Sequence, residues 1–201
     1  MRESRFRVSA GALLAVALLY YLSTPYEAAA VLLPMLFHEL GHVIVLYVLG
    51  LRVTRFRLEL KGYCMYYSGY TGAMGHVLAA AAGPLAGISY ATTAAVLASR
   101  MQSDWLSLSA GISLLLSLFN LLPALPLDGG RIFSALCSAI FGDRTGAMIT
   151  DTTGLAVGAL LLSAGILAMV RGHGIALALA AIWLLLYQEP GLGIVKNREV
   201  L

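Results

Sequence analysis

Charged residues and cysteines are scarce in this chain. Only 11% of its 201 residues are charged, and its two cysteines, Cys64 and Cys137, lie in different segments. So few charges exclude an ordinary soluble domain, in which about 25% of residues are charged. Two cysteines without paired spacing give no sign of a disulfide framework or a cysteine-based zinc site. The net charge of +3 comes from scattered basic residues that form no long run, so we expect no nucleic-acid partner.

Apolar residues, by contrast, make up 60% of the chain, and the mean hydropathy is +0.85. This composition predicts an all-α polytopic membrane protein with a single domain over residues 1–201 and about six transmembrane helices. A membrane-embedded chain has the lipid bilayer as its solvent and its first partner. The predicted spans are residues 8–22, 25–50, 75–99, 105–141, 152–170 and 174–187, and the fourth is broken near 123–130.

The first apolar stretch has an alternative interpretation, as the core of a signal peptide cleaved near Ala28-Ala29-Ala30. Against it, Thr24-Pro25-Tyr26-Glu27 has the pattern of a helix start. A Thr cap is followed by Pro in the first helical position and by Glu three residues after the cap. The triple alanine then lies inside the second helix.

Basic residues are concentrated on one side of the predicted topology. Alternating the spans places both ends of the chain and the connections 51–74 and 142–151 on the same side. The opposite side receives only Arg100 and Arg171. By the positive-inside rule the basic side is the cytoplasm, so we expect both termini there. The residues on that side are Arg2, Arg5, Arg7, Arg52, Arg55, Arg57, Lys61, Arg144, Lys196 and Arg198.

Ionisable residues within the apolar spans are few, and three of them form a candidate metal site. His38 and His42 are one helical turn apart in the motif H-E-L-G-H, so both imidazoles can bind one metal ion while Glu39 reaches its water. Asp128, near the break in the fourth span, offers a carboxylate. Two imidazoles, one carboxylate and an open fourth position suit a catalytic Zn²⁺. Such residues are costly in lipid and usually functional.

The segment from Asn120 to Arg131, N-L-L-P-A-L-P-L-D-G-G-R, cannot be an uninterrupted helix. Pro123 and Pro126 lack amide donors, and Gly129-Gly130 should loosen the backbone. Lipid tolerates such a break only where it is buried in protein or lines a wet cavity, so we expect a cavity beside Asp128. The alternative is a plain Pro-Gly loop between two helices, with Asp128 as a cap.

Between the second and third spans, apolar and charged residues alternate over residues 53–61. The alternation predicts a half-buried strand, and Gly62 allows a turn into a second strand at 63–67. We therefore expect a small membrane-associated β-hairpin whose edge, through Phe56, Leu58 and Leu60, binds an unwound substrate by main-chain pairing. An amphipathic connector touching anionic lipid head groups is the alternative.

Five further residues lie in the third span or near the break in the fourth. Ala79, Gly83 and Gly87 repeat at four-residue spacing in the third span, which predicts a packing face against neighbouring helices. His76, at the start of this span, either lines the cavity or is simply solvated. Arg131 either pairs with Asp128 or stabilises the broken segment.

The H-E-L-G-H motif and the segment from Asn120 to Arg131 together closely resemble those of the site-2 proteases, which are intramembrane zinc metalloproteases of peptidase family M50. The likeness extends from the second to the fourth span and is that of the small bacterial, sporulation-type branch without PDZ or CBS modules. It implies one Zn²⁺ per chain on His38, His42 and Asp128, with Glu39 as catalytic acid and base. It also implies that Asn120 helps hold the substrate or the developing oxyanion.

In the third span, Ala82-Gly83-Pro84 is similar to the G-P motif of this family. Gly87 departs from it, because several relatives have Asn at this position. The resemblance implies a multi-pass protein of a bacterial cell membrane that cleaves a single-span membrane protein, with a regulatory membrane partner as a further candidate. Two other functions stay open: a metal-ion transporter, since intramembrane His and Asp also suit an ion path, and an inactive relative that only binds membrane proteins. Neither the substrate nor the oligomeric state can be read from the sequence.

Overall fold

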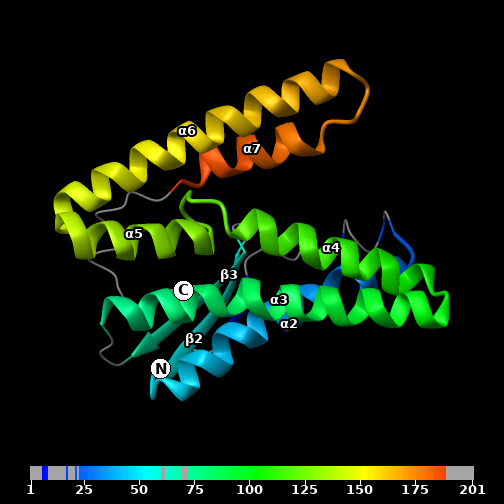
Figure 1. Cartoon of the computed structure of the whole chain (residues 1–201), viewed down its shortest axis with the longest axis horizontal. Helices are drawn as coiled ribbons and strands as arrows, with labels where there is room; N and C mark the ends of the chain where they lie inside the picture. The colour runs from blue at the N-terminus through cyan, green and yellow to red at the C-terminus, as the bar shows by residue number, and fades with distance from the viewer. Residues whose placement is uncertain are drawn as a thin grey trace. The chain divides into compact units, whose positions relative to one another are not determined.

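The computed structural model describes residues 6–8, 17, 21, 23–59, 62–68 and 72–188. These residues form two compact units that divide in the sequence between Asn120 and Leu121. The elements of the first unit are β1 (Phe6–Val8), α2 (Pro25–Val48), β2 (Arg52–Glu59), β3 (Gly62–Ser68), α3 (Ala73–Met101) and α4 (Asp104–Asn120) (Figure 1). Those of the second unit are α5 (Asp128–Phe141), α6 (Asp143–Val170) and α7 (Ala176–Leu186).

Helices dominate the described residues, and three of them, α2, α3 and α6, are long and apolar enough to cross a membrane. The helices α4 and α7 are shorter and also apolar. The predicted class of a mostly helical membrane protein is thereby supported, while the number of six spans stays a prediction. The predicted first span, residues 8–22, falls almost entirely outside the described residues, and its first residue, Val8, belongs to β1.

Helix α2 begins as its sequence predicts. The Glu27 amide donates to Thr24 Oγ1 at 3.2 Å, and the Thr24 amide donates to a Glu27 carboxylate oxygen at 2.8 Å. This reciprocal capping box satisfies two amides that a helix start otherwise leaves without a partner. Ala28 and Ala30 are buried inside the helix, as the helix-start interpretation requires.

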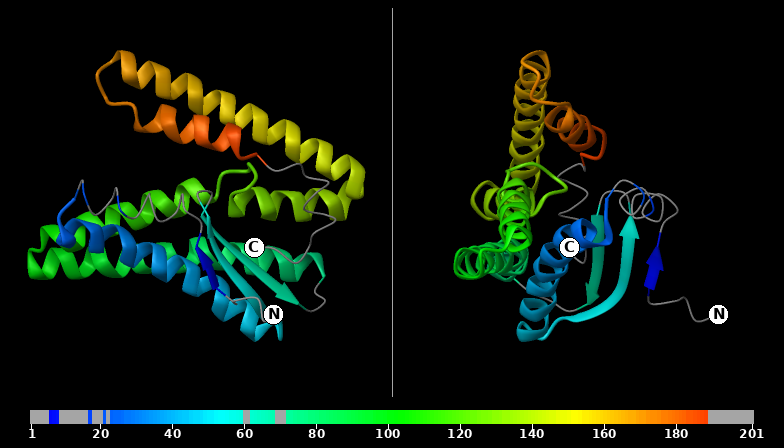
Figure 2. Two further views of the ribbon diagram at one scale, coloured as in Figure 1. Left: turned by 180° about the vertical axis from the view of Figure 1, so that it is seen from behind. Right: turned by 90° about the vertical axis from the view of Figure 1, so that its right-hand side faces the viewer.

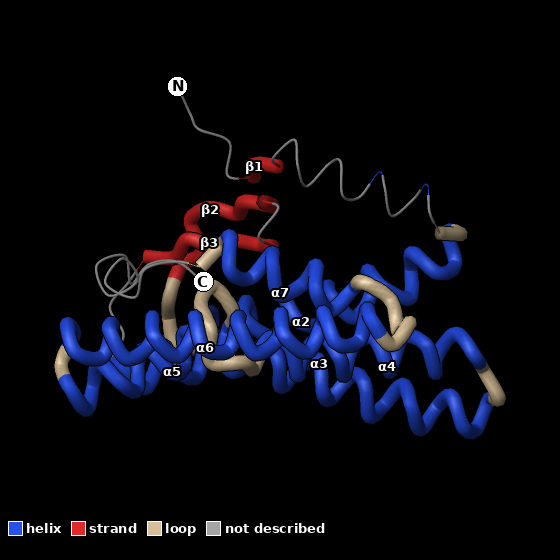
Figure 3. The backbone as a smooth tube through the Cα atoms, turned by 90° about the horizontal axis from the view of Figure 1, so that it is seen from above, coloured by secondary structure: helices blue, strands red, loops and turns tan. Residues whose placement is uncertain are grey.

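Helix α3 packs against both α2 and α4 in the first unit (Figure 3). The approach to α2 is close, because a Cβ atom at Gly41 would lie 2.5 Å from the carbonyl oxygen of Ala82. In lipid, where no hydrophobic effect drives helices together, such small residues allow backbones to approach and gain dispersion contacts. Gly41, inside H-E-L-G-H, therefore contributes to helix packing and not to metal binding.

A row of buried serines forms the contact between α4 and α3. Ser109, Ser113 and Ser117 recur at four-residue spacing and are at most 1% exposed. Ser109 Oγ lies 2.7 Å from the hydroxyl of Tyr90, and Ser113 Oγ donates to the Gly87 carbonyl at 2.8 Å. A Cβ atom at Gly87 would overlap Ser117 Oγ. The predicted packing role is thus confirmed for Gly87, and a larger side chain at this position would displace the serine.

The predicted hairpin is present, but it belongs to a sheet of three strands in the order β1-β2-β3 (Figure 2). The strand β2 pairs antiparallel with β3, and β1 pairs parallel with the other side of β2, with Phe6 opposite Phe56. β1 was not predicted, because three residues are too few to show an alternating pattern. The edge strands of the described sheet are therefore β1 and β3, and the expected open edge along Phe56 and Leu58 of β2 is wrong.

In the second unit, α6 begins at Asp143 and so includes most of the predicted connection 142–151. The reason is tertiary burial: Ala147 and Thr150 have 0% exposure, and a Cβ atom at Gly146 would lie 2.6 Å from the backbone of α5. The polar residues of this segment, which suggest a solvated connection, thus form the first turns of a helix that packs on α5. Helix α7 then runs back alongside α6 (Figure 1).

Candidate metal centre

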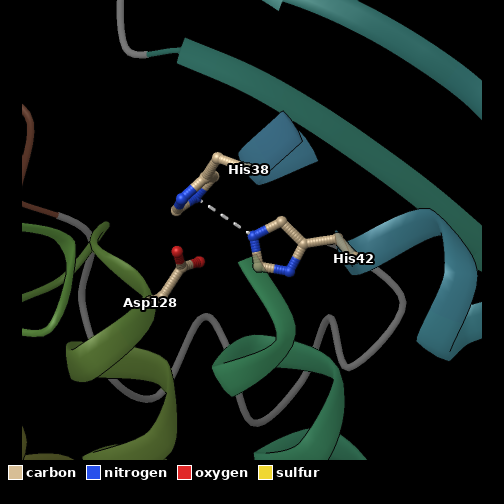
Figure 4. Close-up of side chains that lie close together, drawn as sticks. All are labelled: His38, His42 and Asp128. Carbon is tan, nitrogen blue, oxygen red and sulfur yellow. Dashed lines mark hydrogen bonds between the residues drawn. The ribbon is translucent and has the colours of Figure 1, made fainter. Parts of the chain in front are cut away.

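Helix α2 carries the two histidines on one buried face. His38 and His42 are 4% and 3% exposed, and their ring centroids are 5.0 Å apart with the planes at 76°. Their two Nε2 atoms lie 3.3 Å apart (Figure 4). The i, i+4 spacing brings the rings together because side chains one turn apart stack on the same face. Two imidazole nitrogens that approach each other in an apolar interior are suited to share one metal ion.

The Nδ1 atom of His42 has a defined partner, the carbonyl oxygen of Ala79 on α3, at 2.7 Å. A carbonyl oxygen only accepts hydrogen bonds, so Nδ1 carries the ring proton and donates it. The lone pair of this imidazole is then on Nε2, the atom that faces His38. Hydrogen bonds of this kind orient metal-binding histidines in other proteins.

Gly83, one turn after Ala79, lies against both rings. A Cβ atom at this position would lie 2.7 Å from Nε2 of His38 and would overlap Nε2 of His42. Because residue 83 has no side chain, the backbone of α3 can approach both nitrogen atoms without pushing the rings apart. A pair of imidazole nitrogens, with the cradle next to them left to a glycine, fits a metal ion.

Glu39 follows His38 on α2 and is partly exposed, whereas both histidines are buried. Successive residues on a helix are about 100° apart around its axis, so the carboxylate emerges beside the histidine face. Partial exposure of Glu39 suits a group that must exchange protons with water.

The predicted break in the fourth span is present, since α4 ends at Asn120 and α5 begins at Asp128. Leu127 occupies the N-cap position of α5, so the alternative in which Asp128 is the cap is not supported. Asp128 is the first helical residue and is only 9% exposed.

Hydrogen bonds inside the second unit hold this break in shape. The Leu127 amide donates to the Ala124 carbonyl at 3.0 Å, and the Ala124 amide donates to the Leu122 carbonyl at 2.8 Å. Arg131 Nε donates to the Pro126 carbonyl at 3.3 Å. The last contact supports the interpretation in which Arg131 stabilises the broken segment.

Gly129 and Gly130 allow this break to fold onto the start of α5. A Cβ atom at Gly129 would overlap the Leu121 carbonyl, and one at Gly130 would overlap the backbone of Ala124. Both residues belong to the helix. The expectation that they loosen the backbone is therefore wrong: their role is close packing around Asp128.

The remaining predicted residues lie as follows. Asn120 ends α4, and its Nδ2 atom donates to the Leu116 carbonyl at 3.0 Å, which uses one of the two N–H groups of the amide. His76 lies near the start of α3 and is partly exposed. Phe56 and Leu58 belong to β2, and Leu60 lies outside the described residues.

Comparison with known proteins identifies the family. A sequence profile of the family described as Peptidase M50B-like matches residues 11–142. The chain belongs to this family. The matched region includes α2 with its H-E-L-G-H motif, all of α3 and α4, and α5 with Asp128. The predicted resemblance to the site-2 proteases is thereby confirmed.

Two curated relatives come from Mycobacterium tuberculosis, strains ATCC 35801 / TMC 107 / Erdman and ATCC 25618 / H37Rv. Both are named zinc metalloprotease Rip3, as a provisional assignment, and are 31% identical to this chain over 169 residues. The alignment covers 78% of this chain but only 42% of each relative. The M50B chain thus spans less than half the length of the curated relatives it matches.

A solved structure shares the fold. The site-2 protease from Methanocaldococcus jannaschii superimposes with a TM-score of 0.70, covering 93% of this chain and 91% of the other, at 22% sequence identity. At this identity the likeness concerns the fold. Together with the apolar helices, family membership makes the M50B chain a membrane protein, as its composition predicts.

The sequence interpretation missed the positions of Ala79 and Gly83. Both were assigned to a packing face, whereas the structure places them against the two imidazoles. The G-P motif at Gly83 and Pro84 was a signal, but it carries no side-chain chemistry from which a role near a metal could be inferred.

Proposed function

We propose that this M50B chain is an intramembrane zinc metalloprotease that hydrolyses peptide bonds in the transmembrane segments of other membrane proteins. One observation carries the proposal: the Nε2 atoms of His38 and His42 lie 3.3 Å apart on a buried face of a helix long enough to cross a membrane. Glu39, between them in the sequence, supplies the carboxylate that peptide hydrolysis requires. The family membership supports the same activity.

Asp128 is the third protein ligand in this proposal. Each of His38, His42 and Asp128 offers one atom of a kind that zinc binds. A carboxylate that is only 9% exposed in an apolar protein is costly to bury, and ionisable groups in such places usually serve a function. Three protein ligands leave a fourth position open, as catalytic zinc sites do and structural ones do not.

Zinc in such a site polarises a carbonyl group and acidifies a water molecule. Glu39 removes a proton from the attacking water as the water oxygen bonds to the scissile carbonyl carbon. The Glu39 carboxyl group then delivers that proton to the amide nitrogen as the carbon–nitrogen bond breaks. The products are a carboxylate and an amine. In this proposal the Asn120 amide helps hold the substrate or the negatively charged oxygen of this step.

The substrate must be unwound before cleavage, because helical hydrogen bonds shield the scissile amide. A strand edge can hold the extended product by main-chain pairing. Since β2 is paired on both sides, the docking edge in this proposal is β3, whose seven residues offer a longer edge than the three of β1.

The test compares the wild-type chain with Glu39→Gln, each co-expressed with candidate single-span membrane proteins, and follows cleavage by gel mobility. We expect cleavage by the wild type alone and equal zinc content in both proteins. Glu27→Gln is the matched control, since it changes a carboxylate at the start of the same helix.

Wild-type cleavage by Glu39→Gln would remove Glu39 from the mechanism. Absence of zinc from the wild-type protein would overturn the proposed function itself. Zinc uptake into proteoliposomes, together with absence of cleavage, would instead favour a transporter.

A further inference from the structure

We propose that α3 is a positioning element of the metal centre: Gly83 keeps open the space that the metal ion occupies, and the Ala79 carbonyl holds His42 in its binding orientation. The inference rests on the proposed function, because it concerns the zinc ion which that function requires. It concerns residues that supply no ligand atom to the ion.

A methyl group at residue 83 would crowd both nitrogen atoms that are proposed to bind the ion. A Cβ atom there would lie 2.7 Å from Nε2 of His38 and nearer still to Nε2 of His42. Zinc binds imidazole nitrogen at about 2.0–2.1 Å. A methyl carbon so close to both nitrogen atoms would press on the rings and on an ion bound between them. A methyl group at residue 83 and an ion bound to both rings therefore exclude each other.

Helix α3 is closely packed against both neighbouring helices, so it has little room to shift. On one side, a Cβ atom at Gly41 of α2 would already lie 2.5 Å from the Ala82 carbonyl, so the two backbones are in close contact. On the other side, Ser113 of α4 donates to the Gly87 carbonyl at 2.8 Å. Because α3 is closely packed on both sides, we expect an added methyl group to displace the imidazoles.

The Ala79 carbonyl acts one turn away on the same face of α3. Its 2.7 Å contact with His42 Nδ1 fixes both the rotation of the ring and the position of its proton. Partners of this kind raise the basicity of a metal-binding histidine and commonly change metal affinity 10- to 100-fold, as an order of magnitude. Since the partner is a backbone atom, its position depends on how closely α3 can approach, which Gly83 permits.

Gly87 provides a matched control on the same helix. Gly87 lies four residues after Gly83, just as Gly83 lies four residues after Ala79. A Cβ atom at Gly87 would also overlap an atom of a neighbouring residue. That neighbour is Ser117 Oγ of α4, not an imidazole. Gly83→Ala and Gly87→Ala therefore both crowd α3, but only the first acts at the metal centre.

The first experiment measures metal binding in the purified full chain. After removal of metal, wild type, Gly83→Ala and Gly87→Ala are titrated with zinc and with cobalt(II), whose visible spectrum reports the ligand geometry. We expect Gly87→Ala to bind one equivalent with the wild-type cobalt spectrum. We expect Gly83→Ala to lose at least about tenfold in affinity and to show an altered spectrum. Wild-type affinity and spectrum in Gly83→Ala would overturn the inference.

A second experiment keeps the inference testable even if Gly83→Ala does not fold. The double variant His38→Ala, His42→Ala lacks the two rings that a methyl group at residue 83 would overlap. In this background, Gly83→Ala should change the thermal unfolding temperature of the metal-free protein far less than it does in the wild-type background. Gly87→Ala should lower the unfolding temperature by the same amount in both backgrounds. If Gly83→Ala lowers the unfolding temperature equally in both backgrounds, residue 83 matters for helix packing alone.

These outcomes separate the inference from the proposed function. A wild-type protein that binds zinc and cleaves its substrate, together with a Gly83→Ala variant that does both equally well, would refute the inference alone. A wild-type protein that binds no zinc would refute the proposed function and, with it, the inference.

Discussion

At the residue scale, the burial of Asp128 is the feature that most closely concerns the candidate metal centre. A carboxylate with 9% exposure in a membrane protein is costly, and such residues usually serve a function. A zinc ion shared with His38 and His42 would provide the positive charge. In that case the role of Asp128 is to bind the metal ion, and its side chain contributes little to the stability of the fold.

Replacing Asp128 by Asn tests this role. The amide has nearly the same shape but no negative charge, so we expect zinc affinity to fall by about 100-fold or more, while the metal-free protein unfolds at nearly the same temperature. Zinc titration and thermal unfolding measure the two effects. Asp143→Asn is the control, because Asp143 is also the first residue of a helix, but an exposed one. Unchanged zinc affinity in Asp128→Asn would exclude Asp128 as a ligand.

The glycines next to Asp128 show how the residue scale leads to the element scale. The sequence suggested that Gly129-Gly130 softens the backbone, but both residues are helical and lie against the carbonyl groups of the preceding break. A side chain there would push the break away from α5 and move the first helical residue, Asp128.

At the element scale, Gly129→Ala should therefore reduce both stability and zinc binding. We expect a loss of about 1–3 kcal/mol in the free energy of unfolding, which is typical of overpacking, and a parallel loss of zinc affinity. Gly111→Ala on α4 is the control, because nothing lies within 4 Å of its Cβ position, and it should be neutral or slightly stabilising. Denaturant unfolding in detergent measures the stabilities. Equal behaviour of the two variants would argue against close packing as the role of Gly129.

The start of α2 allows a second prediction at this scale. Thr24→Ala removes the hydroxyl group that accepts a hydrogen bond from the Glu27 amide. The free energy of unfolding should therefore fall by about 1 kcal/mol, the usual contribution of a helix cap. Because the histidines lie more than three turns further along the helix, zinc affinity should not change. Thr24→Ser, which keeps the hydroxyl group, should restore the wild-type unfolding temperature. A fall in zinc affinity would contradict this prediction.

At the scale of the whole molecule, the distribution of basic residues predicts the orientation in the membrane. Ten of the thirteen lysines and arginines fall on the side assigned to the cytoplasm, and only Arg100 and Arg171 on the other. The turns between α3 and α4 and between α6 and α7 should therefore face away from the cytoplasm.

Reporter fusions test this orientation. Alkaline phosphatase fused after Gln102 or after His173 should be active, and green fluorescent protein fused to the C-terminus should be fluorescent. An inactive phosphatase at Gln102 together with a non-fluorescent C-terminal fusion would reverse the predicted topology. Mixed activity at His173 alone would show that the predicted number of spans is wrong in the second half of the chain.

Features that depend on residues near each other in the sequence were predictable. The membrane class follows from composition, the helix start at Thr24 from a capping pattern, and the imidazole pair from the spacing of His38 and His42. The hairpin follows from alternation over a run long enough to show it. In each case the physical cause lies within one or two turns of helix or along one strand.

Other features depend on contacts between distant segments, and only the tertiary structure decided them. The parallel pairing of β1, the helical start of α6 at Asp143 and the approach of Ala79 and Gly83 to the imidazoles all belong to this group. They involve backbone atoms, which every residue shares, or the absence of a side chain. The H-E-L-G-H motif thus determined which atoms are available to bind a metal ion, while the packing of α3 on α2 decided which backbone atoms hold the rings and lie against them.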